Sequence, residues 1–289
     1  MNLDIQVRIL LQRYARILYL KPYGEDKNRE QEVINIMSIV SSFDNESKSI
    51  IDLDDIFKAP NYIADICIVT FSIQVKEMVL KQYNCKHVGF TKTANGNIDV
   101  YSFIVNGKTI LFYMSPIGSA CAACVMHEIH YVTGASKFIV YGSCGILDVE
   151  KCKGNLIVPN SAYRDEGLSY HYMEVSDYVN IKNSDKLAEI FKKYEYPYVK
   201  GKTWTTDAIY METKNKADAR KNEGCICVEM ESAGLQAMCN YYGYELYIFF
   251  FGADLLNDDA WDKATLGNEE EFDLQRETFK IAVDVAVDL

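Results

Sequence analysis

Short apolar runs alternate with segments of helical spacing from residue 65 onward, and this alternation limits the fold more than any other feature. Residues 66–71 predict a buried strand, and 99–105 and 109–115 predict two strands joined by a tight turn at Asn106-Gly107. Further segments complete the pattern: helices over 74–83, 118–132 and 270–287, and a strand over 137–141. Strands that alternate with helices predict a largely parallel or mixed sheet covered on both faces.

The first 60 residues differ in character from this alternating region. Residues 3–20 space their apolar side chains as a helix does, whereas 21–31 and 42–55 are polar and acidic and predict loops around a short helix. We therefore expect a helical extension over residues 1–60, packed on the domain or on a second subunit. One α/β domain over residues 61–289 follows it, a common size for a single domain.

Composition limits the partners. The formal charge of −11 disfavours nucleic acid and anionic membranes, because both select an excess of Lys and Arg. No apolar run approaches the roughly 20 residues of a membrane span. The first residues lack a basic region followed by a signal-type apolar segment, so we expect a cytoplasmic protein.

The nine cysteines predict neither a disulfide framework nor a metal site, because most lie in apolar segments as small core residues. Cys121 and Cys124 form one close pair and Cys225 and Cys227 another. Neither pair has a second ligand pair at zinc-like spacing, and the histidines at 127 and 130 complete no recognised pattern. We expect no metal.

Acidic residues stand where two apolar runs end. Glu229 and Glu231 lie where a strand-like run gives way to a helix, and Asp254 ends the run 246–253. A Glu side chain accepts hydrogen bonds from two neighbouring hydroxyls, as on a ribose, and a carboxyl in an apolar setting holds a proton for delivery. Ligands of open α/β sheets bind at strand ends. Alternatively, Glu229 and Glu231 are solvated acids favoured by the helix dipole.

Five segments, in order, resemble the nucleoside phosphorylase and nucleosidase superfamily over about residues 60–265. Two of them, around residues 155–172 and 204–213, are similar to its uridine-phosphorylase-like branch. The resemblance implies a three-layer αβα fold with a mixed, partly barrel-like central sheet. The segments are Val140–Gly145, Asn155–Pro159 with Tyr163–Tyr172, Trp204–Thr213, Val228–Ala233 and Gly252–Asp262.

The same resemblance implies roles at the sugar and the base. Cleavage of an N-glycosidic bond builds positive charge on the ribose and negative charge on the departing base. Glu231 would then bind the 2′- and 3′-hydroxyls, Met230 would pack under the ribose, and Glu229 would line the sugar or base side. Asp254 would be the catalytic acid that protonates the leaving base, and the alternative is an aspartate that makes a turn.

For the phosphate, the resemblance implies Ser143 with the backbone of Gly142, although a glycine-rich turn that serves only geometry is the alternative. Two phosphate-binding arginines of the family are missing, since this chain has the stretch 70–76 and Val140 at those places. Two cations could compensate weakly, or could be ordinary surface residues: Lys76, and Lys86 from a neighbouring subunit.

Around the base, the resemblance implies Cys144, Gly145, Ile209 and Tyr210, with Ile209 in place of the family's stacking aromatic residue. Asp254 favours a purine, whereas residues 164–167 resemble the pyrimidine branch, so the base stays open, as does ribose against deoxyribose. Arg220 and Gln236 match the residues that read a pyrimidine by type alone, and their placement fits poorly.

We therefore expect a nucleoside phosphorylase-like pentosyltransferase that uses a nucleoside and orthophosphate, needs no metal or organic cofactor, and forms a homo-oligomer, a dimer or a hexamer as in the family. A nucleosidase, in which water replaces phosphate, is the first alternative. The missing arginines favour it, but the early loop holds no glutamate that would activate water. A non-catalytic nucleoside sensor is the second alternative.

Overall fold

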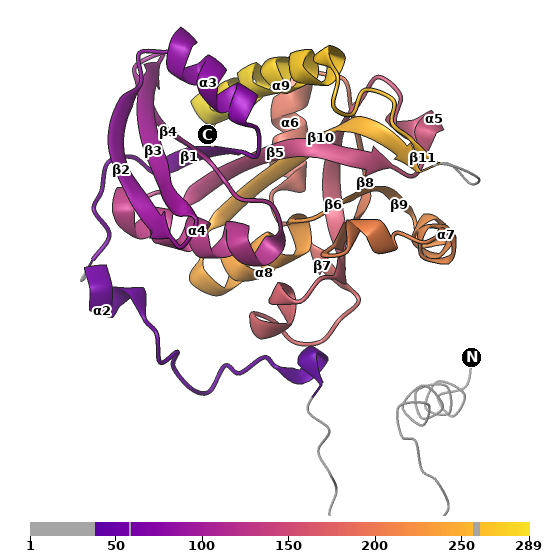
Figure 1. The fold of residues 1–289 in the computed structure, drawn as a ribbon, viewed down its shortest axis with the longest axis horizontal. Helices are drawn as coiled ribbons and strands as arrows, with labels where there is room; N and C mark the ends of the chain where they lie inside the picture. The colour runs from indigo at the N-terminus through magenta and orange to yellow at the C-terminus, as the bar shows by residue number, and fades with distance from the viewer. Residues whose placement is uncertain (1–37, 58, 257–260) are drawn as a thin grey trace, which may run out of the picture. The chain divides into compact units, whose positions relative to one another are not determined.

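A single mixed sheet organises residues 38–57, 59–256 and 261–289, the part of the chain that the computed structural model describes (Figure 1). The helix predicted over residues 3–20 lies outside these residues. The strands are β1 (Ile66–Thr70), β2 (Lys86–Thr93), β3 (Gly96–Val105), β4 (Lys108–Met114), β5 (Lys137–Ile146), β6 (Leu156–Asp165), β7 (Tyr178–Asn180), β8 (Tyr198–Thr206), β9 (Cys225–Glu229), β10 (Glu245–Leu256) and β11 (Trp261–Asp262).

Helices connect most of these strands, and none of the described ones is long and apolar enough to cross a membrane. The α-helices are α2 (Leu53–Phe57), α3 (Ile73–Gln82), α4 (Ser119–Thr133), α5 (Val149–Cys152), α6 (Ser184–Lys193), α7 (Lys214–Asn222), α8 (Ser232–Tyr242) and α9 (Glu269–Asp288). Three short 3-10 turns accompany them: η1 (Ile39–Ser41), η2 (Leu168–His171) and η3 (Ile209–Met211).

The sheet closes on itself over part of its width. Its strand order is β11-β10-β6-β8-β9-β5-β1-β4-β3-β2, with β7 added beside β6. Strand β10 also pairs with β5, so β5, β10, β6, β8 and β9 form a ring. Both parallel and antiparallel pairs occur, since β1 is parallel to β5 and β9 is antiparallel to it. The predicted mixed, partly barrel-like sheet is confirmed.

Helices cover both faces of the sheet, as β1 illustrates. Ile66 and Ile68 pack in a core with α3, α6 and α9, whereas Cys67 and Val69 pack in the core under α4 and α8. Figure 1 shows these two groups of helices on opposite sides of the sheet. Successive side chains of a strand point to opposite faces, so a strand apolar at every position requires this arrangement.

Most predicted elements form within a residue or two, and the predicted hairpin is present. Asn106 and Gly107 both have positive φ, 52° and 77°, as a tight turn between twisted strands requires. The strand predicted over 137–141 is longer than expected. Residues 142–145, for which a glycine-rich turn was the alternative, continue β5 to Ile146, because β10 pairs along them and β9 pairs with Gly145.

The described residues before β1 pack on α4. The hydroxyl of Tyr131 donates a hydrogen bond to Asp54 at 2.8 Å, and the rings of Phe57 and Tyr131 lie 5.6 Å apart. The short helix expected between the polar segments 21–31 and 42–55 falls mostly outside the described residues, whereas α2 begins within the second segment, where a loop was predicted.

Candidate active site

The carboxyl ends of β5 and β10 lie side by side, and β9 passes them in the opposite direction. Gly145 of β5 pairs with Asp254 on one side and with Val228 on the other. Because β9 is antiparallel to β5, the residues after Val228 run back beside those that precede Gly145. The predicted acid, the Gly-Ser-Cys-Gly run and the Glu229–Glu231 turn therefore occupy adjacent strands at one end of the sheet.

Gly145 permits this close approach because it has no side chain. A Cβ atom there would lie 2.6 Å from Cδ1 of Leu256, 3.0 Å from Cγ1 of Val228 and 3.4 Å from Oδ1 of Asp254. The first distance is shorter than carbon atoms tolerate, and the second is tighter than most carbon contacts. The carboxyl group of Asp254 is therefore packed over the backbone of β5, which fixes its position.

A β-bulge and a tryptophan orient Asp254. The pairing of β10 with β5 shifts between Gly252 and Asp254, so Ala253 is an extra residue, and such bulges re-aim the side chain that follows. The indole Nε1 of Trp261 donates a hydrogen bond to Oδ2 of Asp254 at 2.7 Å. Burial raises the pKa of Asp254 against the lowering effect of this bond. A carboxyl with a raised pKa can hold a proton for transfer.

Glu231 precedes α8 and points away from that helix. Its Oε1 accepts a hydrogen bond from the backbone N–H of Gly118 at 2.6 Å, at the start of α4. The side chain is almost fully buried, and this burial, reinforced by the negative charge of Glu229, raises the pKa of Glu231 to about 8. Backbone hydrogen bonds from Gly118 and Met230 act against this rise, so the backbone on both sides holds the Glu231 carboxyl group in place.

Glu229 holds the turn that carries Glu231. Its Oε2 accepts hydrogen bonds from the backbone N–H groups of Glu231 and Ser232, at 2.8 and 2.7 Å, and its Oε1 accepts from the hydroxyl groups of two threonines of β8, Thr203 and Thr205. Both carboxyl groups are buried, so the alternative of solvated acids is wrong for each, although Glu229 does contact the start of α8. The predicted place of Glu229 along the sugar stays a prediction.

The start of α4 is fixed to the same turn. Both the backbone N–H and the hydroxyl of Ser119 donate to the carbonyl oxygen of Met230 at 3.0 Å. A Cβ on Gly234 of α8 would lie only 2.6 Å from the Cβ of Ser119, so this glycine lets the two helices meet. Met230 is half-buried here, and its predicted place under a ribose stays a prediction.

The predicted phosphate residues lie in different places. Ser143 is exposed and Gly142 half-buried near the end of β5. The ammonium group of Lys76 lies 5.9 Å from the ring of Tyr101, on the β3 side of α3. Lys86 is exposed on β2, four strands from β5, which corresponds to roughly 19 Å at the usual strand spacing. Lys86 therefore lies far from the site of its own chain, and its role at the site of a neighbouring subunit stays a prediction.

The predicted base residues extend onto η3. Cys144 is buried beside Gly145, whereas Ile209 is half exposed and Tyr210 almost fully exposed. Sequence analysis missed Glu212, which directly follows this turn. Burial and the negative charge of Asp254 raise the pKa of Glu212 to about 7, against the lowering effect of the positive charge of Lys216. The only signal was that Glu212 stands within the family-like segment 204–213.

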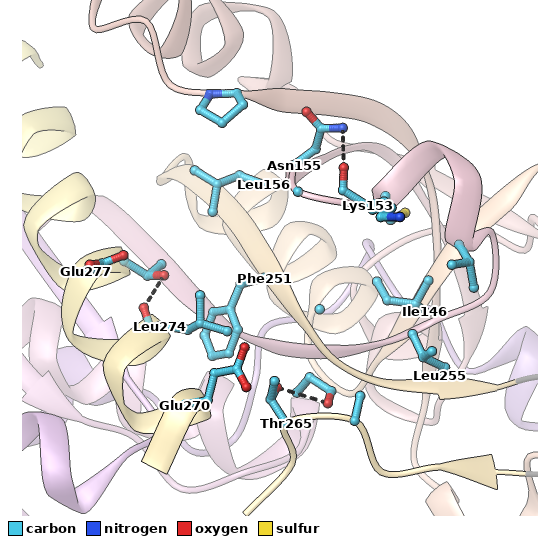
Figure 2. A pocket seen from close by; sticks show the side chains of 18 of the residues that line it. Ile146, Lys153, Asn155, Leu156, Phe251, Leu255, Thr265, Glu270, Leu274 and Glu277 are labelled. Carbon is cyan, nitrogen blue, oxygen red and sulfur yellow. Dashed lines mark hydrogen bonds between the residues drawn. The ribbon is translucent and has the colours of Figure 1, made fainter. Parts of the chain in front are cut away.

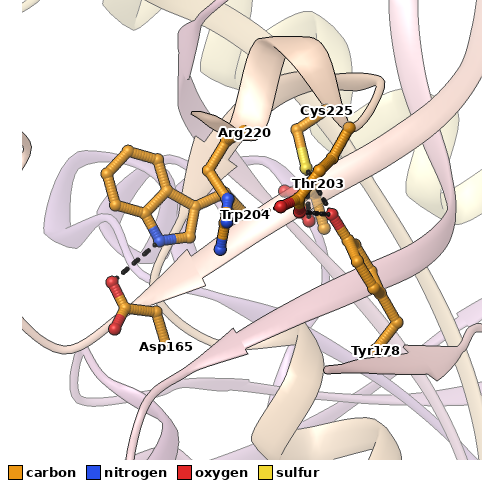
Figure 3. A network of polar contacts seen from close by, with 7 residues as sticks. Asp165, Tyr178, Thr203, Trp204, Arg220 and Cys225 are labelled. Carbon is orange, nitrogen blue, oxygen red and sulfur yellow. Dashed lines mark hydrogen bonds and ion pairs between the residues drawn. The ribbon is translucent and has the colours of Figure 1, made fainter. Parts of the chain in front are cut away.

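The residues that would read a pyrimidine are engaged elsewhere. The guanidinium of Arg220 lies 3.5 Å from the ring of Tyr163 and pairs with Glu223 at 2.7 Å. Figure 3 shows Arg220 in this polar network, with Tyr178 and Cys225 nearby. Gln236 is buried in α8 and donates to Asn240. Neither side chain is available to a pyrimidine ring.

The two cavities that we describe lie outside this set of residues. The larger, of about 920 Å³, lies between α5, β10 and α9 and is lined by residues that include Ile146, Phe251, Leu255 and Leu274 (Figure 2). The smaller, of about 250 Å³, lies beside α7 and is lined in part by Trp204. Neither is lined by Glu231 or Asp254, so the candidate site is defined by its hydrogen bonds and strand pairing.

The cysteine pairs do not form a metal centre in the described part of the chain. Cys121 and Cys124 are exposed on α4, whereas Cys225 and Cys227 are buried in β9. No group of three or more His, Cys, Asp and Glu side chains among the described residues could hold a metal ion.

The partly closed sheet, with acidic residues at adjoining strand ends, defines the class that the five sequence segments suggested. Residues 65–286 match the sequence model of the Phosphorylase superfamily. The chain belongs to this family.

Relatives within the family are distant. The chain is 27% identical over 141 residues to the guanosine phosphorylase of Halorubrum lacusprofundi, over 48% of this chain and 58% of that protein. It is 23% identical over 146 residues to the DeoD-type purine nucleoside phosphorylase of Colwellia psychrerythraea, over 50% of this chain and 62% of that protein. The chain therefore matches less than two thirds of either relative.

Proposed function

We propose that this chain is a pentosyltransferase that cleaves the N-glycosidic bond of a purine nucleoside with orthophosphate, giving the free base and ribose 1-phosphate. The observation that carries the proposal is the pairing of Gly145 with both Asp254 and Val228. This pairing brings a proton-holding carboxyl and the turn of Glu231 to one end of the sheet. Relatives named as purine and guanosine phosphorylases support a purine as the base.

The roles follow from the charges that develop in the reaction. Glu231 accepts hydrogen bonds from the sugar hydroxyls, and Met230 packs under the ring. A phosphate oxygen, held by Ser143 and the backbone of Gly142, forms the new bond to C1′. The electron pair of the C1′–N bond moves to the base, which receives the proton of Asp254, and Asp254 then recovers a proton from solvent.

Asp254→Asn tests the role of the acid. Asparagine still accepts the hydrogen bond from Trp261 but cannot give a proton, so turnover should fall about 10² to 10⁴-fold while nucleoside binding persists. Asp185→Asn, on an exposed carboxyl of α6, is the matched control and should retain full activity. Unchanged turnover in Asp254→Asn would rule out acid catalysis by this residue. A sensor would release no base in either protein.

Hydrolysis of the same N-glycosidic bond by water is the second candidate function, and one observation favours it. The two positions at which the family carries phosphate-binding arginines hold other residues here, and one of them, Val140, is a fully buried core residue. A hydrolase has no phosphate trianion to neutralise and does not need these arginines.

A single assay separates the two reactions. Purine and pyrimidine nucleosides are incubated with the protein in the presence and absence of orthophosphate, and free base is measured. Base release that depends on phosphate supports phosphorolysis, and release at the same rate without phosphate supports hydrolysis. No release from any nucleoside in the panel contradicts both.

A homo-oligomer belongs to the same proposal, in which Lys86 serves the site of another copy. Sedimentation of the purified protein measures its mass. Under phosphorolysis, Lys86→Ala should raise the KM for phosphate more than the KM for the nucleoside. A monomer that retains full activity contradicts this arrangement.

A further inference from the structure

Glu212 carries a half-buried carboxyl group that the proposed reaction does not use. Its backbone N–H donates to the carbonyl of Ile209 at 3.3 Å and closes η3. Within the described residues its carboxyl group has no hydrogen bond and no ion pair. Such a group in a protein interior usually serves a ligand or a reaction.

The segment that carries Glu212 is attached to the strand end that carries Asp254. Helix α7 begins two residues after Glu212, and at its other end the ammonium group of Lys221 donates to the carbonyl oxygen of Leu256 at 3.2 Å. Leu256 lies two residues beyond Asp254 on β10. The η3–α7 segment is therefore attached to the end of β10, and the charges of Asp254 and Glu212 interact.

Exposed apolar side chains flank Glu212. Ile209, Tyr210 and Met211 on η3 are each at least half exposed, which gives a ring-shaped ligand a surface to stack on. A base that lies against η3 and takes its proton from Asp254 would present the neighbouring edge to Glu212. The two carboxyl groups then contact adjacent atoms of the same base.

We propose that Glu212 determines base specificity, and that it selects bases that carry an exocyclic amino group beside the ring nitrogen that Asp254 protonates. This inference rests on the proposed function. An ionised carboxylate accepts a hydrogen bond from an amino group, whereas it repels the lone pairs of a carbonyl oxygen at the same place. A hydrogen bond to a charged group contributes about 1.5 to 3 kcal/mol, or roughly 10- to 150-fold in rate.

Adenosine and inosine test the proposal, because one carries an amino group at this position of the purine and the other a carbonyl oxygen. The wild type should show at least about a tenfold higher kcat/KM for adenosine. In Glu212→Gln the side chain is neutral and can donate as well as accept, so the preference should fall at least about tenfold, mainly by a gain with inosine. Glu189→Gln, an exposed residue of α6, is the control and should keep the wild-type preference.

The pH dependence of the wild type gives a second measurement that needs no variant. The pKa of Glu212 is about 7, so the carboxyl group is mostly neutral at pH 6 and mostly ionised at pH 8. The preference for adenosine should therefore rise between pH 6 and pH 8, and should stay constant in Glu212→Gln.

The outcomes separate this inference from the proposed function. If the wild type releases base but prefers inosine, or if Glu212→Gln keeps the wild-type preference, the role of Glu212 is wrong and the nucleoside-cleaving function stands. If the wild type releases base from no nucleoside, the proposed function itself fails.

Discussion

Replacing Glu231 by glutamine should stabilise the folded protein at pH 9 and leave its stability little changed near pH 5. Glutamine is neutral at every pH and still offers an oxygen to the N–H of Gly118. The wild type differs because burial raises the pKa of Glu231 from 4.5 to about 8. Between these two values the folded state holds a proton that the unfolded state releases. Wild-type stability is therefore lost as the pH rises through this range.

The size of the effect follows from the two pKa values. The difference between 4.5 and about 8 corresponds to about 5 kcal/mol, at about 1.4 kcal/mol per pKa unit. Local rearrangement of the folded protein recovers part of this cost, so we expect Glu231→Gln to gain about 2 to 4 kcal/mol over the wild type at pH 9.

Urea unfolding of both proteins at pH 5, 7 and 9 measures this difference, with the free energy of unfolding extrapolated to water. Glu189→Gln, an exposed glutamate of α6, controls for the loss of a negative charge and should follow the wild type at each pH. If the difference between Glu231→Gln and the wild type stays within about 0.5 kcal/mol from pH 5 to pH 9, Glu231 is not held protonated.

Three further substitutions test the packing and hydrogen bonds of the site. Gly145→Ala places a methyl group 2.6 Å from Leu256, so it should lower the free energy of unfolding in urea by about 1 to 3 kcal/mol and lower turnover about 10²-fold. Gly167→Ala is the control and should be tolerated, because its methyl group would meet no atom closer than 3.5 Å. Equal turnover in both variants would contradict the packing argument. Trp261→Phe removes a hydrogen bond that lowers the pKa of Asp254, so the alkaline limb of the plot of kcat against pH should move to higher pH. If this limb does not move, Trp261 does not control the pKa of the catalytic acid. Thr205→Val removes hydrogen bonds to Glu229 and from the N–H of Ala233 and should destabilise by about 1 to 3 kcal/mol; unchanged unfolding would show that Glu229 does not depend on them.

The layers and the local elements were predictable, because local patterns determine them. A fully apolar run such as 66–70 identifies a strand buried on both faces, and Asn106-Gly107 identifies a tight turn. The ring closure depends on pairing between β5 and β10, which are about a hundred residues apart in sequence, and no local pattern specifies it. We expected a partly barrel-like sheet only because the family resemblance implies one.

The site was predictable as a set of candidates but not as a division of roles. Glu229 and Glu231 look alike in sequence, but their hydrogen bonds differ. Glu229 accepts from backbone N–H groups at the start of α8, whereas Glu231 accepts from the N–H of Gly118. Glu212 was missed because its proximity to Asp254 depends on how α7 attaches to β10. The glycines of 142–145 suggested a turn, because glycine is frequent both in turns and where two chains approach closely.

Closure of the five-stranded ring has a consequence for how new specificities could arise. No strand of the ring can slide or tilt alone, because each has a neighbour on both sides, so the sugar and acid groups form a constant frame. The segment 207–224 leaves the ring after β8 and rejoins it at β9, and β11, which carries Trp261, pairs with β10 at the end of the strand order. Insertions or exchanges there would change which base is accepted without disturbing the bond that is broken.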